Sequence, residues 1–559
     1  MKNKTTTKRI FLIGLAAGLL ALAGCGDKAP ESITGMLSGP AASEPFTVLA
    51  TSDLRDAQPL EEMARKATGI PLKFRFGGTM ESTEAVQTGQ ANADGAWFAN
   101  AKYLLSDPKG QAQVKLQEKI MLSPVVVGVN ESQARALGWD KPEVAAQVTW
   151  RTIAEAAQRG DLKYALSNPA TSNQGFMALM GVVASAAGKS EALTASDVDR
   201  KAIAGFIKGY RLPGDNSTYL SERFIEQQGT RVNAFINYES WLLSLNQSGK
   251  LREKLTLIYP HEGVATADYP LMLLNDGKRE QYQKLVAYLK GEEAQAWLAR
   301  TTLRRPVNPD VARAQAGLFP QGSMLVELPF STDRALADGL IDAYLNEFRT
   351  PIASTFVLDV SGSMSREGRR QQLVDALQYI AGDDASLTGR IARLTDREKI
   401  WMLTFSEQVN RPVFFQLPAS KPGATGVQLQ AGSDARRRVL GDVRDYAESL
   451  QMSGGTALYD AVLVALRTMA SERVKNPGYQ YSVVAFTDGE NNKGLSLAEF
   501  KTAYARLPED VRAVPVFMVL FGEANEEALK ELVQTTGGRL FDARKASLYS
   551  VFRDIRAYQ

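Results

Sequence analysis

Two successive series of short β-rich runs, each alternating with segments of helical period, limit the folds open to this chain. The first series starts at residue 46, and the second starts after Thr350-Pro351. Such alternation is typical of α/β layering, in which helices cover the faces of a sheet. The 559 residues also exceed what a single hydrophobic core normally serves. We therefore expect an α/β protein with two bodies, residues 46–345 and residues 350–559.

The strongest strand signal lies in the second series. Residues 355–360 form a β-branched and aromatic run without helical period, as expected of a strand buried on both faces of a parallel sheet. Leu373, Leu377 and Ile380 then recur with helical spacing and predict a covering helix. Repetition of this order predicts a doubly wound, Rossmann-like sheet. The expected strands are residues 46–50, 72–76, 125–129, 234–238 and 255–259 in the first body, and 355–360, 400–405, 481–486 and 514–520 in the second. The expected helices include residues 60–67, 82–88, 439–450, 457–470, 497–504 and 526–533.

The first 25 residues carry a targeting signal. Four basic residues precede an apolar run at 10–23, which is shorter than the roughly 20 residues needed to span a bilayer. The run ends at Leu22-Ala23-Gly24-Cys25, which holds the only cysteine of the chain. This ending resembles the bacterial lipoprotein box, which implies that residues 1–24 are a signal peptide and that Cys25 is lipidated; ordinary secretion is the alternative. With residues 25–45 as a tether, we expect a cell-envelope protein held on a membrane by its lipid and facing the periplasm.

Charge and residue counts exclude several kinds of chemistry. The formal net charge is +3, but the basic residues of the removable segment account for it, so the mature chain is close to neutral. A neutral chain has no overall electrostatic attraction to nucleic acid. Cys25 and His261 are the only residues of their types, so a disulfide, a zinc cluster and a Cys-His dyad are all excluded. His261 follows Pro260 in a turn-like setting and is expected in a surface or hinge position.

Oxygen-bearing side chains follow the expected strand ends of the second body. They occupy three separate loops, and in an open α/β sheet such loops meet at the carboxyl edge of the strands. Hydroxyl and carboxylate oxygens are the ligands that Mg²⁺ prefers, usually together with water. A coordination position facing solvent would be filled by an acidic residue of a partner protein. The set is Asp359, Ser361, Ser363, Thr456 and Asp488.

These residues resemble the metal-ion-dependent adhesion site of von Willebrand factor type A domains. Asp359, Ser361 and Ser363 match the first element of that site. Thr456 matches its middle threonine and Asp488 its last aspartate. The resemblance covers residues 350–559 and implies a Mg²⁺ ion, or Mn²⁺ or Ca²⁺ in its place. It further implies that the serines contact the metal directly, that the aspartates act through water, and that a protein partner supplies an Asp or Glu.

A metal-dependent hydrolase is the enzymatic alternative. Phosphatases of the haloacid dehalogenase type also place an Asp after a buried strand, but they need a second acid two residues later. Ser361 occupies that position here. A neutral hydroxyl cannot replace the missing acid, so we expect that the chain is not an enzyme.

Residues 46–345 resemble a bacterial periplasmic solute-binding protein of type II, with two lobes around a cleft. The resemblance lies in residues 46–52, 76–79, 167–172 and 260–271. It implies a small-molecule site formed by loops and helix starts, where hydroxyls and N–H groups favour anions. Trp97, Tyr238 and Tyr269 are candidate cleft aromatics, although single aromatics beside apolar runs more often belong to the core. The candidate ligand-binding residues are Thr51, Gly78, Thr79, Thr171, Ser172 and Tyr238.

Two functions follow from these features. The leading hypothesis is a cell-envelope lipoprotein that binds a protein partner through a Mg²⁺-dependent adhesion site, with a solute-binding-like module. The alternative is a solute receptor of a membrane transporter, with the second body as a docking accessory.

Overall fold

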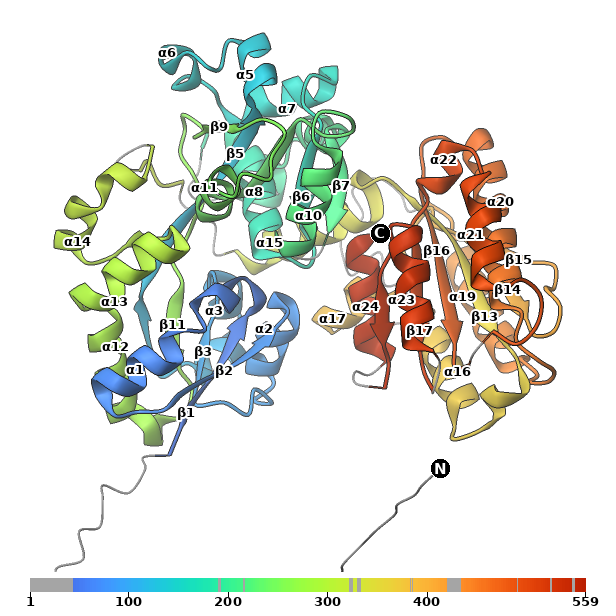
Figure 1. Cartoon of the computed structure of the whole chain (residues 1–559). Helices are drawn as coiled ribbons and strands as arrows, with labels where there is room; N and C mark the ends of the chain where they lie inside the picture. The colour runs from blue at the N-terminus through green and yellow to red at the C-terminus, as the bar shows by residue number, and fades with distance from the viewer. Residues whose placement is uncertain are drawn as a thin grey trace, which may run out of the picture. The chain divides into compact units, whose positions relative to one another are not determined.

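Figure 1 shows the computed structural model of the chain. It describes residues 44–189, 193–214, 217–320, 325–328, 333–382, 384, 386–419, 434–489, 491–522, 525–544 and 548–559. The predicted signal peptide, Cys25 and nearly all of the predicted tether lie outside the described residues. The described chain is a mixed α/β structure with three sheets, which confirms the predicted fold class.

The first sheet belongs to the first body and has the strand order β2-β1-β3-β11-β4. β1 runs parallel to β2 and β3, whereas β11 pairs antiparallel with β3 and β4. β11 comes from much later in the chain, so the first lobe is built from two separate segments. Its strands are β1 (Phe46–Thr51), β2 (Leu72–Gly77), β3 (Gly95–Trp97), β4 (Leu116–Lys119) and β11 (Pro270–Leu273).

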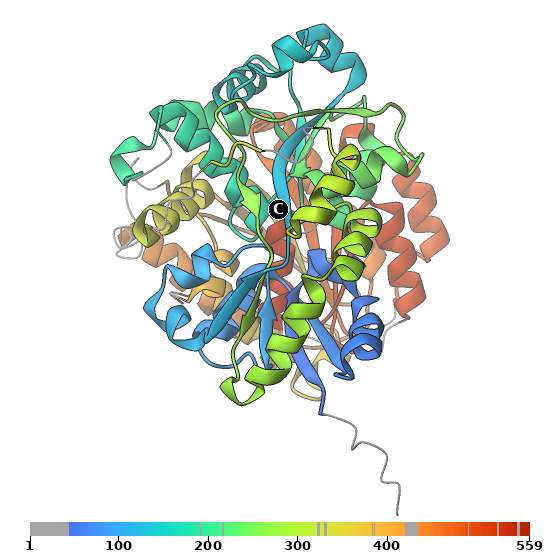
Figure 2. The same ribbon diagram turned by 90° about the vertical axis from the view of Figure 1, so that its left-hand side faces the viewer.

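The second sheet has the order β10-β5-β8-β6-β7, and β9 and β12 also pair with β5. The ten-residue strand β5 follows β4 directly and carries the chain into this second lobe, as Figure 2 shows for the long cyan-blue strand. Residues 267–270 bring it back. The strands are β5 (Met121–Asn130), β6 (Tyr164–Ser167), β7 (Tyr210–Gly214), β8 (Ala234–Tyr238), β9 (Leu255–Ile258), β10 (Thr266–Ala267) and β12 (Arg305–Pro306).

The third sheet forms the second body and has the order β15-β14-β13-β16-β17-β18. All its pairings are parallel except that of the edge strand β15. The chain extends from β13 to β14 on one side and later returns to β16 on the other, so the end of β13 is a topological switch point. The strands are β13 (Ile352–Asp359), β14 (Lys399–Phe405), β15 (Val413–Gln416), β16 (Gln480–Thr487), β17 (Val516–Leu520) and β18 (Leu540–Asp542).

Helices cover both faces of the third sheet. Alternate residues of β13 enter two separate cores: Phe356 and Leu358 pack with α16, α19 and α24, and Val357 packs with α20, α21 and α23. This explains the continuous apolar run, because a strand buried on both faces has no solvent side. The helices of this body are α16 (Arg369–Ile380), α17 (Leu387–Ala392), α19 (Asp434–Glu448), α20 (Leu458–Lys475), α21 (Leu497–Ala505), α22 (Glu509–Arg512), α23 (Glu526–Thr535) and α24 (Leu548–Tyr558).

The first body contains more helix than the sequence suggested, and α2 begins three residues before the expected start at residue 82. Its helices are α1 (Leu60–Thr68), α2 (Thr79–Gln87), α3 (Lys102–Leu105), α4 (Pro108–Gln113), α5 (Glu131–Leu137), α6 (Pro142–Ala145), α7 (Trp150–Arg159), α8 (Asn173–Ala187), α9 (Arg200–Lys208), α10 (Ser217–Gln227), α11 (Glu239–Gln247), α12 (Arg279–Leu289), α13 (Glu292–Trp297), α14 (Pro309–Ala314) and α15 (Arg334–Ala343).

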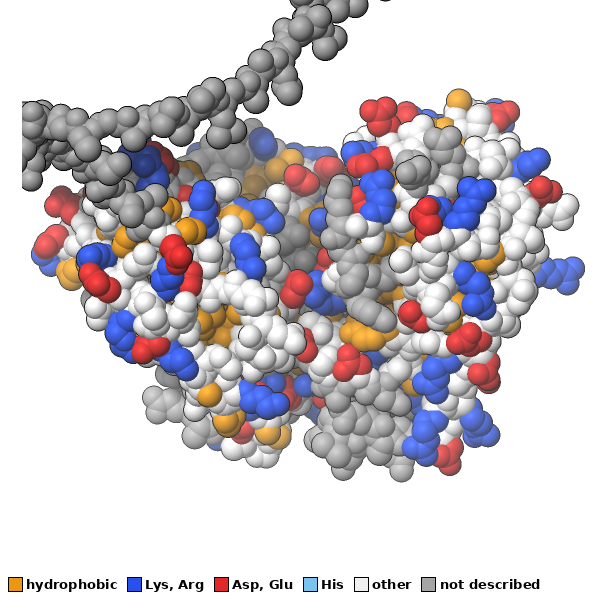
Figure 3. Space-filling model, turned by 90° about the horizontal axis from the view of Figure 1, so that it is seen from below, with side chains coloured by type: hydrophobic (Ala, Val, Ile, Leu, Met, Phe, Trp, Pro, Cys, Tyr) orange, Lys and Arg blue, Asp and Glu red, His pale blue; other side chains and the backbone are white. Residues whose placement is uncertain are grey.

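The surface is charged but mixed in sign. On the face seen in Figure 3, Lys and Arg side chains are interspersed with Asp and Glu. Such a surface fits the neutral balance expected from the sequence. Among the helices of the described residues, none has both the length and the apolar character to cross a membrane.

Candidate metal centre and solute cleft

The candidate metal centre lies at the carboxyl end of β13. Asp359 is the last residue of the strand, and Ser361 occupies the N-cap position of the short 3-10 helix Gly362–Ser365 that follows, without a side-chain capping hydrogen bond. The loop before α20 is held against this turn by backbone hydrogen bonds. The Ser453 N–H donates to the Val360 carbonyl over 2.8 Å, and the Gly362 N–H donates to the Gly454 carbonyl over 3.0 Å. These bonds position the loop that carries Thr456.

Direct contacts connect four of the five predicted residues. The Ser361 N–H donates to Oδ1 of Asp359 over 2.8 Å, and the Ser361 and Ser363 hydroxyl oxygens lie 3.0 Å apart. Ser363 in turn donates its hydroxyl hydrogen to Oδ1 of Asp488 over 2.7 Å. Two loops that are distant in sequence therefore meet at one point.

Thr456 lies beside the same group, across Gly489 from Ser363. A Cβ atom at Gly489 would lie 3.4 Å from the Ser363 Oγ and 3.9 Å from the Thr456 Oγ1. The two hydroxyls thus flank one position that carries no side chain. The structure brings all five predicted residues together, and their role as metal ligands stays a prediction.

Burial shapes the electrostatics of this centre. The Asp359 side chain is fully buried, and loss of water raises the pKa of its carboxyl to about 6. Hydrogen bonds from Ser361 and Thr487 oppose this rise, and the nearby Asp488 carboxylate adds to it. Thr487 donates its hydroxyl hydrogen to Oδ2 of Asp359 over 2.7 Å. The site therefore holds a desolvated carboxyl group whose ionised form a nearby cation would stabilise.

The donor set suits a hard divalent ion. It offers three hydroxyls and two carboxylates, and such oxygen ligands are those that Mg²⁺ and Mn²⁺ accept. Within the part of the chain that the structure describes, no group of three or more His, Cys, Asp or Glu is placed so that it could hold a metal ion. A softer metal that needs nitrogen or sulfur ligands does not fit these residues, whereas Mg²⁺ does.

Sequence reasoning missed two residues of this centre. Thr487 orients Asp359, and Arg369 forms an ion pair with Asp488, with Nη1 2.7 Å from Oδ2. Thr487 immediately precedes Asp488 at the end of β16. This adjacency could have indicated that Thr487 belongs to the centre. Nothing in the spacing of Arg369 indicates that it reaches the site.

A cavity of about 990 Å³ lies in the described chain and contains most of the predicted solute-binding residues. Gly78, Thr79, Thr171, Ser172 and Tyr238 line it. Thr51 does not, because its side chain is buried at the end of β1 and the following Ser52 and Asp53 reach the cavity instead. Trp97 and Tyr269 are fully buried core residues, and His261 is exposed at the surface.

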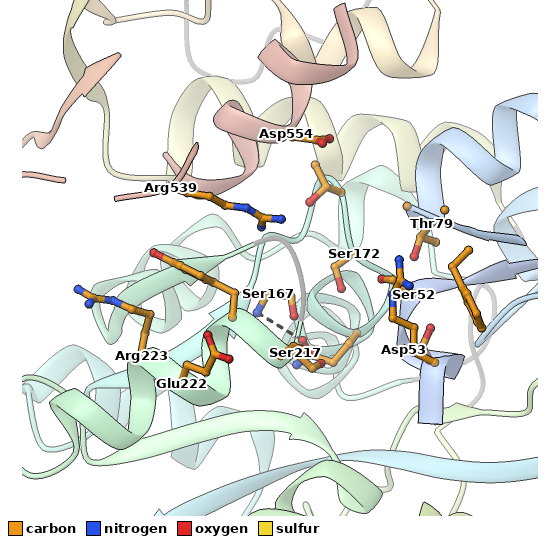
Figure 4. A pocket seen from close by; sticks show the side chains of 18 of the residues that line it. Ser52, Asp53, Thr79, Ser167, Ser172, Ser217, Glu222, Arg223, Arg539 and Asp554 are labelled. Atoms are coloured by element: carbon orange, nitrogen blue, oxygen red, sulfur yellow. Dashed lines mark hydrogen bonds between the residues drawn. The ribbon is translucent and has the colours of Figure 1, made fainter. Parts of the chain in front are cut away.

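Three helix starts meet at this cavity: Thr79 of α2, Asn173 of α8 and Ser217 of α10. The N-cap residue Ser172 makes no side-chain capping hydrogen bond, and the N-cap Gly78 has no side chain that could make one. Helix starts present N–H groups and favour anions. Figure 4 shows Ser172 and Ser217 on one side of the cavity and Ser52 and Thr79 on another.

Charged side chains of both signs line the same cavity. Arg539 and Asp554 of the second body are among them, as Figure 4 shows. Burial raises the pKa of the Asp53 carboxyl, while the Arg304 guanidinium opposes that rise. The charge of the lining alone therefore does not select an anion or a cation. The charged lining residues are Asp53, Arg55, Glu81, Glu222, Arg223, Glu226, Arg539, Arg553 and Asp554.

The described chain has two α/β modules, and each of them matches a family model. Residues 46–303 match the family model described as bacterial extracellular solute-binding protein. Residues 355–554 match that of the von Willebrand factor type A domain. The chain thus combines a solute-binding domain with a von Willebrand factor type A domain.

Three solved structures are similar to about half of this chain at low identity, and the first of them is a periplasmic binding protein. One from Actinobacillus pleuropneumoniae, with exogenous fructose-6-phosphate bound, has 11% identity and a TM-score of 0.43, with 54% of this chain and 98% of that chain covered. One from Trichodesmium, in complex with iron and citrate, has 17% identity and a TM-score of 0.41, with 53% and 98% covered. A ferric binding protein from Campylobacter jejuni has 11% identity and a TM-score of 0.41, with 53% and 96% covered. No curated protein matches the chain.

Proposed function

We propose that this chain is a cell-envelope lipoprotein that binds another protein through a divalent-metal site in its von Willebrand factor type A domain. The observation that carries the proposal is the meeting of Asp359, Ser361, Ser363, Thr456 and Asp488 at the switch point of the third sheet. When bound, Mg²⁺ would supply a coordination position for an Asp or Glu of the partner.

Each side chain has a part in this proposal. Ser361 and Ser363 present neutral oxygens at the turn after β13, which leave the metal more electrophilic than several direct carboxylates would. Asp359 and Asp488 supply the negative charge of the site. Thr456 enters from the separate loop before α20 and completes the set. The five residues include no imidazole or thiol, and in this proposal the two carboxylates serve the metal instead of acting as catalytic bases.

The proposal is tested by metal uptake and partner capture with matched variants of the full chain. Asp359→Ala should abolish Mn²⁺ binding, measured by calorimetry, and the chelator-sensitive capture of an envelope protein. Ser365→Ala is the control, because Ser365 lies on the same turn but donates its hydroxyl hydrogen to the Gly362 carbonyl and not to any of the five site residues. Retention of Mn²⁺ binding by Asp359→Ala would contradict the proposal.

A solute receptor of a membrane transporter is the second candidate function. The specific observation in its favour is the convergence of the α2, α8 and α10 starts on the 990 Å³ cavity. An anionic solute bound there would raise the melting temperature of the full chain by linkage. Phosphate, sulfate, citrate and sugar phosphates are suitable probes. A rise in melting temperature that is lost in Ser172→Asp and kept in Ser196→Asp would support a functional cleft. Ser196 serves as the control because it lies outside the cavity lining.

A further inference from the structure

Arg369 shares the Asp488 carboxylate with the candidate metal centre. Its Nη1 donates to Oδ2 of Asp488 over 2.7 Å, while Ser363 donates to Oδ1. The Asp488 side chain is 0% exposed and that of Arg369 is 12% exposed. The Arg369 guanidinium therefore lies within the candidate metal centre, in contact with one of its two carboxylates.

The local backbone is arranged to deliver this guanidinium. Arg369 is the first residue of α16, where the helix dipole disfavours a cation. Two residues in left-handed conformation precede it, Glu367 with φ 53° and Gly368 with φ 71°. Gly522 leaves the necessary room, because a Cβ atom there would lie 2.9 Å from the Arg369 Cζ. The helix-start position of Arg369, the two left-handed residues before it and the absence of a side chain at Gly522 thus together bring one positive charge to Asp488.

Charge counting shows what Arg369 changes. Asp359 and Asp488, when ionised, give the buried part of the centre a charge of −2, and the guanidinium reduces it to −1. Glu367 also pairs with Arg369, with Oε2 2.8 Å from Nη2, but its side chain is 76% exposed, so solvent screens its charge. With a divalent ion the centre would reach +1, whereas without the arginine it would be neutral. A centre with an uncompensated positive charge attracts a further carboxylate much more strongly than a neutral one. The same positive charge opposes binding of the metal alone.

The geometry points to Arg369 as a built-in competing cation that makes metal binding and carboxylate binding depend on each other. The inference rests on the proposed metal-dependent function. It adds that the site binds its metal weakly when no acidic group is bound, and more tightly when one is. The acidic ligand lowers the repulsion between the metal and Arg369, so each ligand raises the affinity for the other by the same factor. The ligand class is a carboxylate, such as an Asp or Glu side chain.

The test is a Mn²⁺ titration of the full chain followed by electron paramagnetic resonance of the free ion. Arg369→Gln should bind Mn²⁺ on the order of tenfold more tightly than the unmodified chain, because one repelling charge is removed. Arg369→Lys retains the charge and should stay close to the unmodified chain. Arg370→Gln is the matched charge control, because Arg370 is next in α16 but donates to the Leu450 and Glu448 carbonyls. It should change the affinity far less.

A second titration uses acetate as the minimal carboxylate, at constant ionic strength. Acetate should raise the apparent Mn²⁺ affinity of the unmodified chain and raise that of Arg369→Gln less. Equal or weaker Mn²⁺ binding by Arg369→Gln would overturn the inference, as would an equal gain in Arg370→Gln or no acetate effect on the unmodified chain. None of these three results would contradict the proposed metal site itself. Absence of Mn²⁺ uptake by the unmodified chain would overturn both.

Discussion

Thr487 donates its hydroxyl hydrogen to Oδ2 of Asp359 over 2.7 Å, although 128 residues separate the two in sequence. Both side chains are fully buried, and they end the neighbouring parallel strands β16 and β13. The bond therefore fixes the orientation of the Asp359 carboxyl from the adjacent strand. It leaves Oδ1 to the Ser361 N–H on the side of the predicted metal ligands.

Replacing Thr487 with valine tests this relationship. The change keeps the shape of the side chain but leaves a buried carboxyl oxygen without its donor, so the free energy of unfolding should fall by about 1 to 3 kcal/mol. Urea denaturation of the metal-free chain measures the effect. Thr502→Val on the exposed side of α21 is the control and should be close to neutral. An unchanged free energy of unfolding in Thr487→Val would show that the bond does not support the fold.

Gly489→Ala tests the room between two predicted ligands. The new methyl group would touch the Ser363 and Thr456 hydroxyls at ordinary contact distances, so the fold should persist. It would occupy the position between them, and Mn²⁺ affinity should fall roughly 10-fold or more. Calorimetry measures the affinity and thermal melting the fold. Gly478→Ala, where the added Cβ would meet nothing within 4 Å, should bind like the unmodified chain. Full affinity in Gly489→Ala would place the metal elsewhere.

A buried ion pair predicts the acid sensitivity of the second body. Arg556 binds both carboxylate oxygens of Glu398, and both side chains are buried. Burial pushes the pKa of Glu398 upward, but the Arg556 guanidinium reverses this and holds the pKa below its ordinary value. The unfolded state therefore takes up the proton first as pH falls. The stabilisation is present above about pH 4.5 and is lost as the pH falls from there through the lower folded-state pKa.

Glu398→Gln should remove most of this contribution. Breaking a buried pair leaves Arg556 without its counter-charge, so the free energy of unfolding at pH 7 should fall by about 3 to 5 kcal/mol. Denaturation between pH 3 and pH 7 checks the size and the window. Glu280→Gln, in an exposed pair with Lys284, should leave the curve unchanged. Equal acid sensitivity in Glu398→Gln and the unmodified chain would show that other groups determine it.

The predicted anchor depends on Cys25. Cys25→Ala should release the chain from the membrane pellet into the soluble envelope fraction, because one removed lipid site eliminates the acyl chains. Fractionation followed by mass spectrometry of the first residues measures both location and lipid. Ser32→Ala in the predicted tether is the control. Equal membrane retention of Cys25→Ala would favour another form of attachment.

The sequence predicts the structure well where a residue pattern is compatible with only one kind of element. The apolar run 355–360 predicted a strand buried on both faces, and β13 is such a strand. The loops after it were predictable because parallel strands end at the same edge. Arg369 was not, because its approach to Asp488 depends on two left-handed residues and a glycine more than 150 positions later. The contribution of Arg539 and Asp554 to the cavity depends equally on tertiary packing.

Anomalous scattering from crystals of the full chain grown with Mn²⁺ tests the metal centre most directly. The account predicts one strong peak at the carboxyl end of β13, within coordination distance of the Ser361 and Ser363 hydroxyl oxygens. The peak should disappear in Asp359→Ala crystals. A strong peak at another place, or none at this turn in the unmodified chain, would contradict it.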